Sequence, residues 1–202
     1  MKLYHTPKAV SPERTYNFLK AKGQLDAVEL VEVSIMKGEH KTPEYKALSP
    51  FSQLPVLVLD DGTKITETRA ICTYFEGLFP DPNLMGADPK EKALIEMWDR
   101  RIEFMFLVQF AQWFRNGNPM MAALENPQVP GAAEKGERNA KWFAKKLNTH
   151  LSEAEWLAAD RFSIADITLY LTTGFCAAMR WNIREEHDQI ARHYAAVKAR
   201  LG

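Results

Sequence analysis

Short apolar runs alternate with amphipathic segments over the first 79 residues, a pattern that predicts strands and helices in turn. Runs of three to six residues rich in β-branched or aromatic side chains predict four strands, at 2–5, 28–33, 56–59 and 64–66. Apolar residues at helical spacing predict helices at 11–23 and 68–79. The order is β-α-β, an irregular stretch, then β-β-α, which indicates a small α/β domain.

The first of these helices, at 11–23, has recognisable start and stop signals. Ser11 suits an N-cap, Pro12 suits the first helical position, and Gly23 follows the last turn. We therefore expect the helix to begin directly after Ser11.

The pattern changes after residue 79. A stretch rich in proline and glycine, "PDPNLMGADP", predicts a linker over 80–88, and everything from 89 to 202 has helical periodicity. Asp88 and Pro89 predict the start of a helix that runs to Arg115. Its middle, residues 104–108, is apolar all round, so both of its sides should be covered. The expected organisation is an α/β domain over 1–79, a linker over 80–88 and an all-helical domain over 89–202.

Two further helices are expected in the second domain. One carries four apolar residues on a single face: Ala140, Phe143, Leu147 and Leu151. The other begins within "RFSIADITLYL", where Ser163 and Asp166 have the spacing of a capping box. We interpret that pair as structural.

Composition narrows the function classes. The 202 residues are 46% hydrophobic, which supports a substantial core, and Lys+Arg and Asp+Glu each number 26. A net charge of zero gives no reason to expect nucleic acid or an anionic membrane as a partner. Cys72 and Cys176 are too far apart in sequence for a metal-binding or redox motif, and Cys72 lies in an apolar helical segment, so we interpret it as a packing thiol. With no long apolar run, a cytoplasmic protein without a metal is expected.

Pro55 stands directly against the apolar run at 56–59. Proline lacks the N–H that a sheet ladder needs, so it is confined to an edge, a bulge or the first position of a strand. From the residues alone, a trans proline opening an edge strand is the simpler interpretation.

The stretch "LSPFSQLPVLVLDDGTKITETRAICTYF" (48–75) resembles the most specific motif of the cytosolic glutathione S-transferases, and "GEHKTPEYKALSP" and "FSIADITLY" fit the same family. The resemblance, closest to bacterial members, extends over essentially the whole chain. It implies a thioredoxin-like α/β domain followed by an all-α helical bundle. Ser49, Ser52, Leu54 and Thr68 are conservative departures from the family pattern, which has Asn, Gly, Val and Ser there. Val10 stands where some bacterial members place cysteine.

The resemblance assigns a role to the proline. It implies a cis Leu54–Pro55 bond, with the backbone of Leu54 free to pair with the cysteinyl part of glutathione. Glu67 and Thr68, at the start of a helix, would hold the γ-glutamyl end, because a helix N-terminus favours an anion. From spacing alone the better explanation is structural, with Thr66 or Thr68 as the N-cap and Glu67 complementing the helix dipole. Gln53 would also bind this end, the alternative being an exposed loop amide.

The same resemblance implies that His40 and Lys41 bind the glycine carboxylate; two solvated loop residues are the alternative. It places the thiol-activating residue near Ser11, whose hydroxyl and helix end would both stabilise a thiolate. Tyr4, His5 and Thr6 are the rival candidates.

The aromatic residues Phe106, Phe110 and Trp113 are more typical of a core, but one edge of this group could line a pocket for an electrophile. The resemblance implies a glutathione transferase involved in detoxification, with glutathione and a small electrophile as partners, and a homodimer that uses residues 104–108. Two alternatives stay open. One is a non-catalytic relative with the same fold, such as the stringent-starvation regulator that binds RNA polymerase. The other is a glutathione-dependent lyase, isomerase, dehalogenase or peroxidase.

Overall fold

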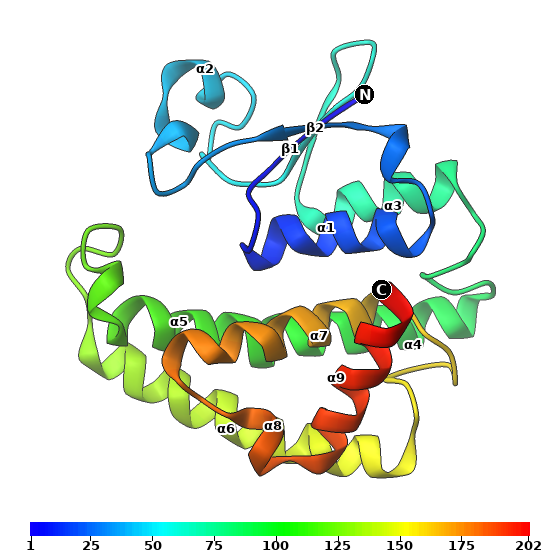
Figure 1. Ribbon diagram of the computed structural model, residues 1–202, viewed down its shortest axis with the longest axis vertical. Coiled ribbons are helices and arrows are strands. Elements are labelled where there is room, and N and C mark those ends of the chain that lie inside the picture. The colour runs from blue at the N-terminus through cyan, green and yellow to red at the C-terminus, as the bar shows by residue number, and fades with distance from the viewer. The chain divides into compact units, whose positions relative to one another are not determined.

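A computed structural model describes all residues, 1–202, and divides them into two compact units, Met1–Leu84 and Met85–Arg200 (Figure 1). The elements of the first unit are β1 (Lys2–His5), α1 (Val10–Ala21), η1 (Leu25–Ala27), β2 (Glu29–Glu32), η2 (Glu39–Lys41), α2 (Pro43–Lys46), β3 (Val56–Val58), β4 (Lys64–Thr66) and α3 (Thr68–Leu78).

The four strands form one sheet in the order β2-β1-β3-β4. β1 runs parallel to β2 and antiparallel to β3, and β3 runs antiparallel to β4. Figure 1 shows α1 and α3 together on one side of the sheet and the α2 segment on the other. This is a thioredoxin-like arrangement, as expected from the sequence.

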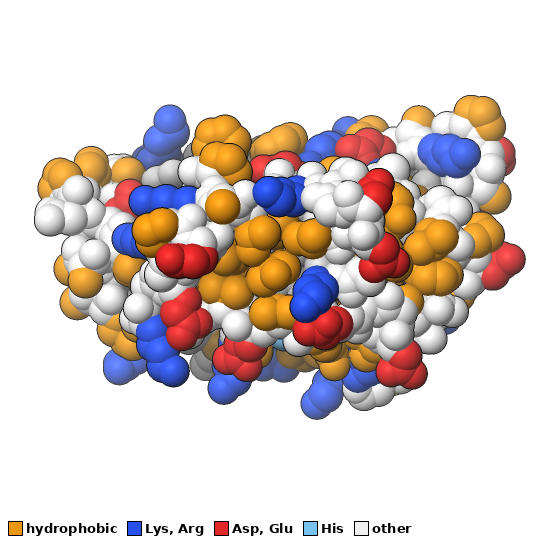
Figure 2. All heavy atoms as spheres, turned by 90° about the horizontal axis from the view of Figure 1, so that it is seen from above, with side chains coloured by type: hydrophobic (Ala, Val, Ile, Leu, Met, Phe, Trp, Pro, Cys, Tyr) orange, Lys and Arg blue, Asp and Glu red, His pale blue; other side chains and the backbone are white.

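The sheet face on the α2 side is only partly covered. Tyr45 of α2 packs with Val33 and Val56, while neighbouring apolar residues on this cluster stay partly exposed: Tyr4, Leu48, Leu54 and Val58. Figure 2 looks at the molecule from this side and shows apolar side chains gathered at the centre, with charged residues spread around them.

The expected capping by Ser11 is wrong. α1 begins at Val10, its N-cap is Ala9, and no side chain caps it. Ser11 is therefore the second residue of the helix, two positions further in than the Ser-Pro pattern predicts. Proline is also tolerated elsewhere in a first helical turn, because the N–H groups there have no partner within the helix.

The second unit is all-helical, as expected. Its elements are α4 (Pro89–Arg101), η3 (Ile102–Leu107), α5 (Val108–Gly117), η4 (Pro119–Met121), α6 (Pro130–Glu153), α7 (Ile164–Phe175), η5 (Cys176–Met179), α8 (Ile183–Glu186) and α9 (Asp188–Leu201). α5 packs along α6, and Gly136 permits the close approach, since a Cβ there would lie 2.6 Å from the Gln109 carbonyl oxygen.

The helix predicted from Asp88 to Arg115 is continuous but not uniform. Asp88 caps it, accepting the Glu91 N–H at 2.9 Å, and its middle segment, Ile102–Leu107, is a π-helix. Only one side of this segment is covered within the chain, because Ile102 and Phe106 are buried whereas Phe104 is 56% exposed.

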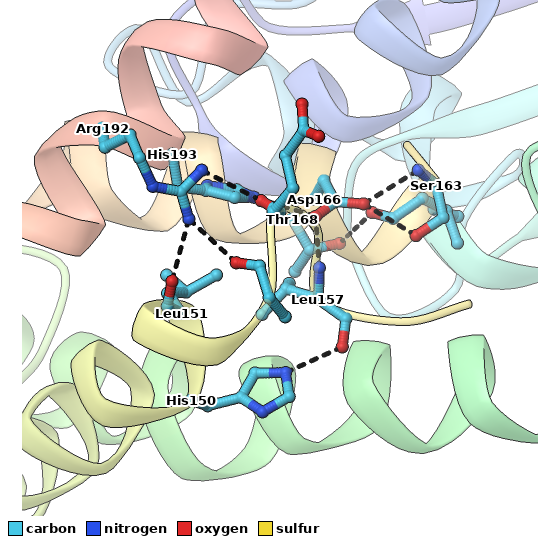
Figure 3. A network of polar contacts seen from close by, with 11 residues as sticks. His150, Leu151, Leu157, Ser163, Asp166, Thr168, Arg192 and His193 are labelled. Carbon is cyan, nitrogen blue, oxygen red and sulfur yellow. Dashed lines mark hydrogen bonds and ion pairs between the residues drawn. The ribbon is translucent and has the colours of Figure 1, made fainter. Parts of the chain in front are cut away.

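The predicted capping box at the start of α7 is confirmed. Ser163 and Asp166 make the reciprocal side-chain to backbone bonds, and both are buried. Asp166 also accepts the Leu157 N–H at 3.0 Å and pairs with Nε2 of His193 at 2.8 Å (Figure 3). The motif thereby ties the loop before α7 and helix α9 to one carboxylate.

Candidate functional site

The sheet register brings four candidate segments to one end of the first unit. Tyr4 pairs with Val56, and Val56 pairs with Thr66. The carboxyl ends of β1, β2 and β4 therefore lie at the same end as the amino end of β3. The segments that extend from this end carry Ser11, residues 40–41, residues 53–55 and residues 67–68, so the sheet itself gathers the predicted site residues.

The N-terminus of α3 is the best-defined part of this end. Its N-cap, Glu67, has φ 69° and ψ 120° and provides no side-chain cap, and its carboxylate side chain is exposed. The first hydrogen bond within the helix is from the Ile71 N–H to the Glu67 carbonyl, at 3.0 Å. The N–H groups of residues 68–70 thus have no partner inside the helix, which is the arrangement that binds anions.

The conformation of Glu67 is unusual for a residue with a Cβ. Such a sparsely populated backbone region costs about 1–3 kcal/mol and persists where the surrounding structure imposes it. Here Thr66 is fixed in the β4 ladder on one side and Thr68 in α3 on the other. The turn between them directs the Glu67 side chain to solvent.

Thr68 does not use its hydroxyl as a cap. The side chain is buried, and its hydroxyl donates to the Ser11 carbonyl oxygen at 3.2 Å. This bond joins the first turn of α1 to the first turn of α3. It also leaves the backbone N–H of Thr68, rather than its O–H, as the donor open to a ligand.

Hydrogen bonds from the α2 segment fix the backbone at residues 53–55. The Gln53 N–H donates to Oγ of Ser49 at 3.1 Å, and the Gln53 carbonyl accepts the Tyr45 hydroxyl at 2.8 Å. Burial, and then the neighbouring Tyr4, raises the pKa of Tyr45, so this hydroxyl stays a proton donor. The Gln53 side chain is exposed.

The Leu54–Pro55 peptide bond is cis in the structure. Pairing between β3 and its neighbours starts at Val56, so the backbone of Leu54 lies outside the ladder.

Tyr45 was not singled out from the sequence, and Ser49 was named only as a departure from the family pattern, although Thr42-Pro43-Glu44 has the pattern of a helix start. Thr42 is the N-cap of α2, accepting the Tyr45 N–H at 3.3 Å, with Pro43 at the first position. That signal could have located the short helix that supports Gln53.

The candidates for thiol activation differ in what their side chains do. Tyr4 packs edge-on against Tyr45 with ring centroids 6.4 Å apart, and the Thr6 hydroxyl donates to the Val33 carbonyl. His5 stacks on Tyr16 with centroids 6.3 Å apart. Ser11 is half-buried at the start of α1 and contributes its carbonyl, not its hydroxyl, to the bond with Thr68.

His40 and Lys41 are neighbours on η2 with different environments. His40 is only 9% exposed, whereas Lys41 is exposed. Burial, and secondarily the charge of Lys41, lowers the pKa of His40 below its ordinary value. At neutral pH the imidazole is therefore an uncharged group beside a cation.

The three aromatic residues considered for an electrophile pocket belong to the second unit. Phe106 and Phe110 are 0% exposed and lie in its core, among Phe143, Trp181 and aliphatic residues. Their rings present no surface to a ligand, because core packing has used both faces. Trp113 is partly buried at the edge of the same cluster.

No group of three or more His, Cys, Asp or Glu side chains is placed to hold a metal ion. None of the helices combines the length and apolar composition needed to cross a membrane.

Comparison with known proteins agrees with this geometry. Residues 11–78 match the sequence model of the glutathione S-transferase N-terminal domain. The chain is 32% identical over 210 residues to Glutathione S-transferase 2 of Saccharomyces cerevisiae, an alignment that covers 99% of this chain and 86% of the relative.

Solved structures give the same picture. A glutathione S-transferase domain-containing protein of Marinobacter aquaeolei superposes with a TM-score of 0.94 at 37% identity, covering 99% of this chain and 98% of that one. Gtt2 of Saccharomyces cerevisiae superposes with a TM-score of 0.92 at 33% identity, covering 98% and 96%.

A thioredoxin-like domain followed by an all-helical domain is the arrangement of the glutathione S-transferase fold. The chain belongs to the glutathione S-transferase family and is similar to Gtt2.

Proposed function

We propose that the protein is a glutathione transferase that binds glutathione at the end of the first unit's sheet and adds its thiolate to a small electrophile. Family membership supports the activity. The observation that supports the site is the N-terminus of α3, where the N–H groups that precede the first bond within the helix and an exposed carboxylate, Glu67, lie beside the start of α1.

The γ-glutamyl group fits the N-terminus of α3. Its carboxylate would accept the N–H groups of residues 68–70, and its ammonium would pair with Glu67. The exposed Gln53 amide would hydrogen-bond the same group. These contacts satisfy both charges of the γ-glutamyl end.

The rest of the peptide fits the neighbouring segments. The cysteinyl backbone would pair with Leu54, which precedes the β3 ladder, in the manner of an added strand. At the glycine carboxylate Lys41 would supply the charge and neutral His40 an N–H donor.

Ser11 is the proposed thiol-activating residue. Its hydroxyl would donate to the glutathione sulfur, and the positive end of α1 would add to the effect, because both stabilise the thiolate. The thiol proton passes to solvent. The thiolate then forms a carbon–sulfur bond with the electrophile, whose leaving group departs with the bonding electron pair.

Calorimetric titration with glutathione tests the binding site. Glu67→Ala should weaken binding by about 1.5–3 kcal/mol, the range for a hydrogen bond to a charged group. Asp26→Ala provides the control, since Asp26 is equally exposed but lies between α1 and β2, at the other end of the sheet.

A second ligand tests specifically whether Glu67 binds the ammonium of glutathione. The glutathione analogue with a glutaryl group in place of γ-glutamyl lacks the ammonium, so it should bind the wild-type protein and Glu67→Ala equally well. No heat from a folded sample with millimolar glutathione would refute the proposal. If Glu67→Ala weakened the binding of both ligands equally, Glu67 would not be the partner of the ammonium.

A further inference from the structure

The second unit contains a cavity whose residues belong to no part of the proposed glutathione site. Its volume is about 210 Å³. α4 contributes Leu94 and Trp98, the end of α6 contributes His150, and the loop that leads to α7 supplies the remaining lining residues: Ala154, Trp156, Leu157, Ala158, Ala159 and Asp160. The lining is therefore mainly aliphatic and aromatic.

One wall of the cavity is a stack of two rings. Trp98 and His150 lie with centroids 4.0 Å apart and planes inclined by 25°. Nε2 of His150 lies 3.0 Å from the Leu157 carbonyl oxygen. Because a carbonyl can only accept, Nε2 carries the hydrogen of this bond.

The loop that forms the opposite wall is fixed by contacts on both sides (Figure 3). Leu157 is held through its carbonyl by His150 and through its N–H by Asp166, at 3.0 Å each. The Arg192 guanidinium donates to the carbonyls of Leu151 and Ala154, both at 2.9 Å. The cavity is thus preformed, and a ligand would not have to order this loop on binding.

Asp160 is the acidic residue among those that line the cavity, and its side chain is exposed. The nearby cations Arg161 and Arg192 already have partners, since Arg161 pairs with Glu91 at 3.1 Å and Arg192 donates to loop carbonyls. Arg101 lies over the Trp98 ring at 5.0 Å from its centroid and is not a lining residue.

We propose that this cavity binds small aromatic ammonium compounds. The aromatic ring of the ligand would fill the space among Leu94, Leu157 and the two indoles, and its ammonium would pair with Asp160. Trp98 would not contact the ammonium with its ring face, because His150 stacks on that ring at 4.0 Å and Arg101 lies over it at 5.0 Å, so Asp160 is the group that recognises the charge. The volume suits a single ring with a short side chain rather than a larger ligand.

Fluorine NMR of protein labelled with 5-fluorotryptophan tests the proposal, with phenethylamine as the probe. The chain has five tryptophans, of which Trp98 and Trp156 line the cavity. Their signals, assigned through Trp98→Phe and Trp156→Phe, should shift saturably. The other three should not move, and they serve as internal controls: Trp113, Trp142 and Trp181.

Two matched probes separate charge from shape. 2-Phenylethanol, which lacks the charge, should bind about tenfold more weakly, equivalent to about 1.4 kcal/mol. Phenylacetate, with the opposite charge, should bind more weakly still. Asp160→Asn should reduce the affinity for phenethylamine to that for the alcohol. Asparagine tolerates the left-handed backbone of this position, φ 48°, so the fold is preserved.

Glu134→Gln, which removes an exposed charge on α6 outside the cavity, should leave all three affinities unchanged. Glutathione binding should be unaffected by Asp160→Asn, so failure here is distinguishable from failure of the proposed function. No saturable shift, equal affinity for amine and alcohol, or tighter binding of phenylacetate would overturn the proposal.

Discussion

The Ser11 hydroxyl is half-buried at the positive end of α1, in the turn that Thr68 ties to α3. Because Ala9, and not Ser11, is the N-cap, the Ser11 hydroxyl does not cap the helix. A role in thiol activation can therefore be tested with little interference from helix stability.

We predict that Ser11→Ala raises the pKa of the bound glutathione thiol by about one to two pH units. Losing a hydrogen bond to a charge costs about 1.5–3 kcal/mol, and one pH unit corresponds to 1.36 kcal/mol. Thiolate absorbance of the complex against pH measures this effect. The free energy of unfolding should change by less than about 0.5 kcal/mol. An unchanged thiol titration would transfer the role to a neighbouring residue, with His5 the next candidate.

His40 offers a second prediction at this scale. Its pKa is lowered, first by burial and then by Lys41, so the unfolded chain takes up its proton at a higher pH than the folded protein. As pH falls through 6.5, the ordinary value, this difference destabilises the folded state. We expect the free energy of unfolding of wild-type protein, relative to His40→Gln, to be smaller at pH 5.5 than at pH 7.5. Urea unfolding at both pH values measures it, and an equal difference would contradict the prediction.

At the scale of elements, the start of α7 depends on one buried carboxylate. Asp166 accepts from the Ser163 N–H at 2.8 Å and the Leu157 N–H at 3.0 Å, and it pairs with His193. A capping residue alone stabilises a helix by about 1 kcal/mol. Asp166 connects three segments, so its loss also leaves buried partners unsatisfied.

We predict that Ser163→Ala lowers the free energy of unfolding by about 1 kcal/mol. Asp166→Ala should lower it by about 3 kcal/mol or more, because each buried group left unpaired adds about 1–3 kcal/mol. Asp166→Asn, which keeps the shape but not the charge, should fall between them. Equal losses for Ser163→Ala and Asp166→Ala in urea unfolding would show that Asp166 acts only as part of the cap.

Much of this architecture could be predicted from local sequence signals. The Asp88 cap, the Ser163–Asp166 box and the strands at 56–58 and 64–66 follow from residues within a few positions of one another. The start of α1 was misplaced because Ser-Pro fits more than one position of a first turn. The π-helix was not predictable, since it depends on how distant helices pack.

The sequence named the residues of the candidate site, but not its geometry. Glu67 and Ser11 are 56 positions apart in the chain, and only the strand register places their segments at one end of the sheet. The positive φ of Glu67 and the bond from Thr68 to Ser11 have no signal in composition or periodicity. Such features arise from tertiary contacts.

At the scale of the whole molecule, one exposed apolar surface stands out on the second unit. It consists of Phe104, Met105 and Val108, which are 56%, 38% and 39% exposed although the segment is apolar. Their neighbours Phe106 and Leu107 are buried in the unit's own core. Three adjacent apolar residues on the open side of a helix favour a contact with another chain.

We propose that this surface contacts its copy in a homodimer. The wild-type protein should then sediment at twice the 23.1 kDa of one chain at micromolar concentration. Phe104→Glu should dissociate it, because the contact would bury an unpaired charge. Trp142→Glu is the matched control: Trp142 is an aromatic residue 51% exposed on α6, outside this surface. A wild-type mass near 23.1 kDa, or equal dissociation by Trp142→Glu, would count against a dimer built on Phe104, Met105 and Val108.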